Sequence, residues 1–164
     1  MSELPAKNRN LVLAATSIGA IMTPLLGTMI ILAMPLIGTE FSVSARDLGW
    51  LSTAFILANA ICLVPASWFV DKIGYKKSYI IGTAVVAIAC FLSVFAPNYS
   101  ILIALRVITG AGISLVMITS IAILTRIFPK TKRGFVIGIN TTMVYVGLTL
   151  GPFLGGVLTD AFGW

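Results

Sequence analysis

The chain has 164 residues, of which 59% are hydrophobic and 10% are charged, and its formal net charge is +6. Soluble domains carry about 25% charged residues, so this composition excludes an ordinary water-soluble globular domain. Long uncharged stretches recur along the chain, and a spanning helix needs about 20 apolar residues. We therefore expect an all-α integral membrane protein with transmembrane helices at about residues 11–37, 48–70, 78–96, 101–125 and 134–158.

Most basic residues fall on one side of this predicted topology. Nine of the eleven Lys and Arg residues precede the first helix or follow the second and fourth helices. Cytoplasmic connections carry the excess of positive charge in membrane proteins, so we expect residues 1–10 to form a cytoplasmic tail. The protein should be a multi-pass protein of the cell (cytoplasmic) membrane. Anionic lipid then accounts for the net positive charge without a nucleic-acid partner.

The sequence carries no pattern typical of an enzyme or of a metal site. It contains no histidine, and Cys62 and Cys90 both fall within expected spans, where cysteine behaves as a small apolar residue. No paired nucleophile and base, metal-ligand cluster or phosphate-binding loop is recognisable. We expect no catalytic residue, no metal and no cofactor.

A few polar side chains lie within the expected spans. In hydrocarbon, such groups tend to face other helices. Lining a substrate cavity and packing between helices are therefore alternative roles for them. The candidates are Thr28, Asn59, Thr109 and Tyr145.

The connection after the second helix contains an acid in an unfavourable place. Asp71 lies at the C-terminus of the expected helix, where a negative charge opposes the macrodipole. It therefore needs a partner: Lys72, a basic residue among 126–133, or the N-terminus of another helix. Gly74 would permit a left-handed turn between closely spaced helices. A solvated polar turn with an incidental acid is the alternative.

The fourth expected helix contains an arginine. A cation at the centre of a span costs about 2.5–3.5 kcal/mol on insertion scales, so Arg106 should face the bundle interior or a wet cavity and is a functional candidate. Alternatively, Arg106 has only a structural role. It lies six residues into its helix, so its side chain can reach the outer surface. The sequence offers it no mid-membrane carboxylate, since the acids all lie in termini, connections or helix edges: Glu3, Glu40, Asp47, Asp71 and Asp160.

The fifth expected helix has glycine at every fourth position. Gly147, Gly151 and Gly155 fall on nearly one face, which lets another backbone approach closely. Pro152 removes one backbone donor and favours a kink. A tightly packed structural helix and a helix in direct contact with substrate are both consistent with this pattern.

The connection after the second helix resembles the loop signature of the major facilitator superfamily, G-x-L-a-D-r-x-G-r-k. Asp71, Lys72, Gly74 and Lys76 match it. The departures are Ser67, Phe69 and Tyr75, in place of glycine, leucine and arginine. In that family the loop locks and releases the two halves of the transporter, so the resemblance implies that Asp71 is a gating residue with Gly74 as its turn.

Three later segments also resemble this superfamily. Arg106 with the following glycines is similar to the signature R-x-x-x-G-x-G, which its antiporters associate with proton coupling. Residues 127–134 are similar to the connection f-P-x-x-x-R-G before helix 5. The fifth helix is similar to the antiporter motif G-x-x-x-G-P-x-x-G-G, with the matching residues Gly147, Gly151, Pro152, Gly155 and Gly156.

The first two helices resemble one branch of the superfamily. Residues 25–35 are similar to l-D-x-T-i-V-N-v-A-L-P of drug/proton antiporters, but Leu26 stands for the aspartate and Ile31 for the asparagine. Residues 50–57 follow W-x-x-t-a-Y-x-L, with Phe55 for tyrosine. The resemblance implies a divergent member of this branch, which has fourteen-helix members, and a lipophilic or cationic small-molecule substrate.

Taken together, the resemblance implies the N-terminal part of a multidrug or small-organic efflux transporter, with protons as the coupling ion. Superfamily transporters contain two six-helix bundles, whereas residues 11–164 supply five helices. We therefore expect an incomplete N-terminal bundle that works with missing C-terminal helices or a second chain. The alternative is a non-transporting truncated protein that acts as an assembly or regulatory partner through the glycines of its fifth helix.

Overall fold

The structure, a computed structural model, describes residues 6–164, which form five helices. All are long and apolar enough to cross a membrane, which confirms the predicted all-α transmembrane fold. Residues 1–5 of the expected tail, with Glu3, lie outside the described residues. The helices are α1 (Ala6–Phe41), α2 (Ala45–Ile73), α3 (Tyr75–Ser93), α4 (Tyr99–Ile127) and α5 (Lys130–Phe162).

Polar caps and turns set the helix ends, so most helices extend past the uncharged runs. Ser44 caps α2 by accepting the Asp47 N–H at 3.3 Å, and Asn98 caps α4 in the same way at 2.9 Å from the Ile101 nitrogen. Gly74 alone separates α2 from α3, with a φ of +94° that favours glycine. This confirms the predicted tight turn.

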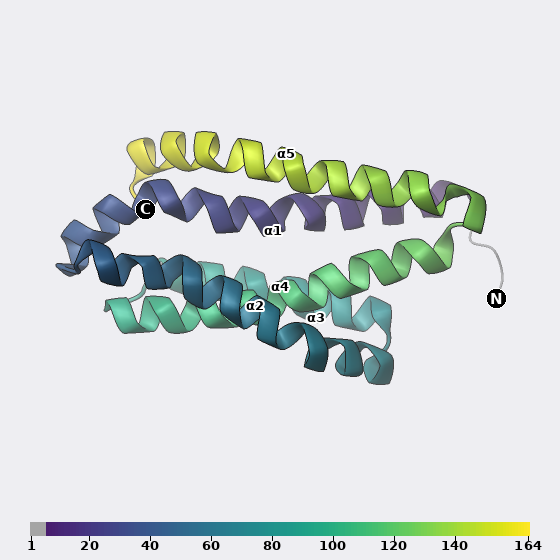
Figure 1. Cartoon of the computed structure of the whole chain (residues 1–164), viewed down its shortest axis with the longest axis horizontal. Coiled ribbons are helices and arrows are strands. Elements are labelled where there is room, and N and C mark those ends of the chain that lie inside the picture. Colours follow the sequence, from purple (N-terminus) through teal and green to yellow (C-terminus); the bar gives the residue numbers. More distant parts are fainter. Residues whose placement is uncertain (1–5) are drawn as a thin grey trace.

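The helices form two groups that lie along one another (Figure 1). The first group is the pair α1 and α5, and in the second group α4 packs against both α2 and α3. Contacts between the groups, mainly of α1 with α4 and α2, are less extensive. We call the boundary between α1 and α4 the seam.

Glycines bring the helices of the first group together. Gly147, Gly151 and Gly155 are buried against α1. A Cβ on Gly155 would lie 2.8 Å from the Met29 carbonyl oxygen, and one on Gly151 would overlap Thr28 Oγ1. The spacing of these glycines therefore correctly predicts a close helix contact.

Glycines act similarly around α4, the most buried helix. Gly110 faces the α2 backbone, and a Cβ there would lie 3.0 Å from that of Ala58. Gly112 faces α3, where a Cβ would lie 2.9 Å from a Val86 methyl group. With α2 and α3 packed this closely, α4 presents its remaining side to α1.

Candidate functional site

A cavity of about 250 Å³ interrupts the seam, near the ends at which α1 and α5 finish and α4 begins. Apolar side chains of α1, α4 and α5 form much of its wall. We call it the Arg106 cavity. Its polar and aromatic lining residues are Cys90, Ser93, Arg106, Thr109, Thr159 and Trp164.

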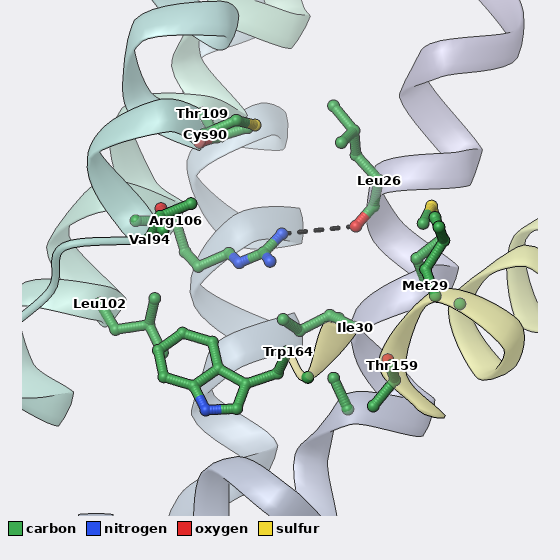
Figure 2. Close-up of a pocket in the computed structure, with 15 residues that line it drawn as sticks. Leu26, Met29, Ile30, Cys90, Val94, Leu102, Arg106, Thr109, Thr159 and Trp164 are labelled. Atoms are coloured by element: carbon green, nitrogen blue, oxygen red, sulfur yellow. Dashed lines mark hydrogen bonds between the residues drawn. The ribbon is translucent and has the colours of Figure 1, made fainter. Parts of the chain in front are cut away.

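Arg106 extends from α4 toward α1 in this cavity (Figure 2). Its Nη1 donates a hydrogen bond to the Leu26 carbonyl oxygen at 3.3 Å. Its Nε is buried and has no hydrogen-bond partner among the described residues. Because a guanidinium carries five N–H donors, most of its donor capacity is not used by the described helices.

The surroundings of Arg106 are short of negative charge. No Asp or Glu lines the cavity within the described part of the chain. Glu40 is exposed and accepts a hydrogen bond from the indole N–H of Trp164, a lining residue. Leu26, whose carbonyl receives the Arg106 bond, stands where the resembled helix 1 signature has its aspartate.

The structure separates the other predicted cavity residues. Thr109 is buried in the Arg106 cavity and donates to the Leu105 carbonyl at 2.7 Å. Thr28 lies at the α1–α5 contact and donates to the Pro24 carbonyl at 2.9 Å. The backbone nitrogen of Asn59 faces Gly110 at the α2–α4 contact. Tyr145 is 64% exposed. Roles for these residues in transport stay predictions.

The α2–α3 turn joins Asp71 to α4 through an intermediate side chain. Tyr75 Oη donates to Asp71 Oδ1 at 3.3 Å and accepts from Arg126 Nη2 at 2.6 Å. The Arg126 guanidinium also lies 4.0 Å from the centre of the Tyr75 ring. The sequence offered Lys72, a basic residue among 126–133 or a helix N-terminus as the partner of Asp71, and it marked Tyr75 only as a departure from the signature.

The remaining loop residues lie at the surface. Lys72 and Lys76 are exposed. The Lys72 ammonium lies 5.0 Å from the centre of the Trp68 ring, within the range of a cation–π contact.

Two further residues of the predicted α5 motif differ in exposure. Gly156, next to the three buried glycines of α5, is half-buried, and Pro152 is exposed within the continuous α5.

A second cavity, of about 260 Å³, interrupts the seam nearer the other end of the helices. Its walls come from α1, α4 and α5, and no charged residue lines it within the described chain. Asn140, one of its lining residues, is buried and donates to the Thr16 carbonyl at 3.2 Å.

The described residues contain no group of three or more His, Cys, Asp or Glu side chains that could hold a metal ion.

Comparison with known proteins places these features in a family. The chain is 31% identical over 158 residues to the riboflavin transporter RibZ of Clostridioides difficile, covering 96% of the chain and 35% of that protein. It is 32% identical over 155 residues to the multidrug resistance protein Stp of Mycobacterium tuberculosis, covering 94% and 29%. It is 31% identical over 169 residues to a methylenomycin A resistance protein of Streptomyces coelicolor, covering 99% and 36%.

The chain thus spans about a third of the length of the curated relatives it matches. The model of one family, described as the Major Facilitator Superfamily, matches residues 16–164. This match covers the glycine contacts, the α2–α3 turn and the Arg106 cavity. The chain belongs to the Major Facilitator Superfamily.

Proposed function

We propose that the chain forms the N-terminal part of a small-molecule efflux transporter. The observation that carries the proposal is Arg106, a cation with unused donors in a cavity between transmembrane helices. Ionisable residues within spans mark substrate or ion pathways because they are costly there. Relatives named for multidrug and methylenomycin A resistance support export as the direction.

The proposed orientation places the α2–α3 and α4–α5 connections in the cytoplasm of the cell. Both connections lie at one end of the bundle (Figure 1). Seven basic residues lie at the helix ends that flank them: Lys72, Lys76, Lys77, Arg126, Lys130, Lys132 and Arg133. The positive-inside rule supports this orientation, with which the Arg106 cavity lies toward the outer side.

The α2–α3 turn is proposed as the gating element. Tyr75 ties Asp71 to Arg126, so α2, α3 and α4 are linked at the cytoplasmic end. Gly74 provides the turn, and Lys72 and Lys76 remain available to lipid or to the other half of a transporter. The α5 glycines would keep α1 and α5 moving as one body while the gate alternates.

Proton coupling is proposed through Arg106 together with a carboxylate. No carboxylate lines its cavity among the described residues, and antiport needs a group whose charge changes with access. We propose that helices corresponding to the remaining two thirds of the relatives, or a second chain, supply this group, and that it pairs with Arg106 only when no substrate occupies the cavity.

Transport measured in membrane vesicles tests this proposal, with the protein used at its native length. We expect an imposed pH gradient to drive extrusion of a lipophilic compound, and Arg106→Ala to abolish it. Arg46→Ala is the matched control, because Arg46 is exposed at the start of α2. Absence of flux under every gradient would refute the transport proposal.

The intact mass of the protein extracted from its own membrane tests the partner question. A mass about three times that of this chain, as the relatives' lengths suggest, would identify the segment as part of one transporter. A mass near 17.4 kDa would favour the alternative role as an assembly or regulatory partner.

A further inference from the structure

We propose that the Arg106 cavity binds an organic anion, with a carboxylate or a similar oxyanion held by the free edge of the Arg106 guanidinium. This inference rests on the proposed transport function and names the charge of its substrate. Of the two alternatives expected from the sequence, a lipophilic or a cationic substrate, it keeps the lipophilic character and replaces the cationic one with an anion.

The donor pattern of Arg106 leaves one edge of the guanidinium free. Nη1 is used by the Leu26 carbonyl. Nε has no partner, and no hydrogen bond from Nη2 is formed within the described residues. Nε and Nη2 form the edge that holds a carboxylate with two parallel hydrogen bonds. A buried charged donor without a partner is costly, so a ligand that supplies two acceptors would relieve this cost.

The charge balance of the cavity favours the same ligand. Among the described residues that line it, Arg106 is the only charged one. Charges interact several times more strongly away from bulk water, so an unpaired cation attracts an anion and repels a second cation. The hydroxyl protons of Thr109 and Ser93 are already donated to backbone carbonyls, at 2.7 and 2.8 Å.

The rest of the cavity suits an apolar body of modest size. Leu26, Met29 and Ile30 from α1 line it together with the indole ring of Trp164 (Figure 2). The volume of about 250 Å³ lies at the small end of ligand pockets, which begin near 300 Å³. A compound with one aromatic ring and one carboxylate matches this volume and this apolar lining.

Three single-ring probes of similar shape separate charge from fit: benzoate, benzamide and benzamidinium. We would titrate each into the purified protein, at its native length in detergent, by calorimetry. Benzoate should bind at least about tenfold more tightly than benzamide, the change expected for hydrogen bonds to a charged group, and benzamidinium should bind most weakly. Equal affinities, or tighter binding of benzamidinium, would overturn the inference.

Variants assign the effect to the guanidinium edge. Arg106→Gln should remove the preference for benzoate, whereas Arg106→Lys should retain part of it, because a lysine keeps the charge but not the paired donors. Arg46→Gln should change nothing, since this arginine is exposed at the start of α2. An unchanged benzoate affinity in Arg106→Gln would overturn the inference.

Leu26→Asp keeps the test decisive if Arg106→Gln does not fold. Leu26 lines the cavity, so a carboxylate at this position would neutralise Arg106. We expect benzoate binding to fall at least about tenfold, and benzamidinium to lose its disadvantage. Unaltered benzoate binding in folded Leu26→Asp would also refute the proposal.

The vesicle assay distinguishes failure of this inference from failure of the transport proposal. Flux that depends on Arg106 while benzoate shows no preferential binding would refute the anion site and leave transport intact. Preferential benzoate binding that is lost in Arg106→Gln, with no flux under any gradient, would support the site and refute transport.

Discussion

The α1–α5 contact and the α1–α4 seam use the same helix in opposite ways. At the contact with α5, glycines let the two backbones approach, so a methyl group has no room. Along the seam, α1 and α4 leave two cavities of about 250 and 260 Å³. The difference shows that α1 is packed closely on the α5 side and borders open volume on the α4 side.

The two seam cavities also differ from each other in charge. They are similar in volume, yet Arg106 lines one while the other has no charged residue within the described chain. Asn140, in the second cavity, uses its amide to bond the α1 backbone. The two cavities are therefore distinguished by a cation with free donors and not by their volume. The following predictions test these differences, beginning with the largest effect.

Breaking the tight contact should have the largest effect. Gly151→Ala places a methyl group against Thr28, and overpacking of this kind destabilises by about 1–3 kcal/mol. Gly138→Ala is the matched control, since a Cβ there has nothing within 4 Å. Unfolding in a detergent titration should show a loss for Gly151→Ala alone.

The double variant with Thr28→Ala sharpens this test. It removes the overlapping hydroxyl oxygen but leaves the Thr28 Cβ 3.0 Å from the new methyl group. Only part of the lost stability should return. Equal effects of alanine at positions 151 and 138 would contradict the proposed division between contact and seam.

Cys90 and Cys62 allow the charge of the seam to be measured. Both are free and half-buried, but Cys90 lines the Arg106 cavity and Cys62 does not. A methanethiosulfonate reagent with a sulfonate group should modify Cys90 about tenfold faster, relative to its trimethylammonium counterpart, than it modifies Cys62, equivalent to about 1.4 kcal/mol. Single-cysteine variants, Cys62→Ser and Cys90→Ser, give the two rates by mass spectrometry.

Arg106→Gln should bring the reagent preference at Cys90 down to that at Cys62. Persistence of the preference would assign the positive potential to groups other than Arg106. The ratio of modification rates complements ligand titration, because it can be measured without a tightly bound ligand.

Tyr79 tests how much one hydrogen bond beside the seam contributes to the free energy of unfolding. Its hydroxyl donates to the Ala15 carbonyl at 2.8 Å, joining α3 to α1. Tyr79→Phe should therefore destabilise by about 0.5–1.5 kcal/mol. Tyr145→Phe is the matched control because Tyr145 is largely exposed, and an equal loss in both variants would show that this bond does not secure the seam.

The helices and their closest contact could be predicted because they depend on patterns within short segments. Apolar length predicted the spans, and the spacing of Gly147, Gly151 and Gly155 predicted a close approach. The helix ends were less accessible, because caps such as Ser44 and Asn98, rather than the limits of the uncharged runs, determine them. Which helices pack against each other could not be predicted from the sequence, because this packing depends on residues far apart in the chain.

The site was predicted in part for the same reason. Arg106 was recognisable because a cation within a span is rare. Its placement against the Leu26 carbonyl, 80 positions away, and beside Cys90 and Trp164 required the folded arrangement. Thr28 and Tyr145 are polar residues in spans like Thr109, and only the packing shows that they lie outside the cavity.

The smallest expected effect is at Tyr75, at the end of the second helix group. Tyr75→Phe keeps the ring that stacks on Arg126 and removes the hydroxyl between Arg126 and Asp71. The loss should stay within about 0.2–1 kcal/mol, since both charged partners are exposed. Tyr75→Arg restores the residue of the loop signature but places two cations together. It should strengthen the link to Asp71 and release Arg126, so hydrogen exchange should slow at the α2–α3 turn and quicken at the end of α4. Slower exchange at both places would mean that Arg126 is held by groups other than Tyr75, and that the turn and α4 are not linked through this side chain.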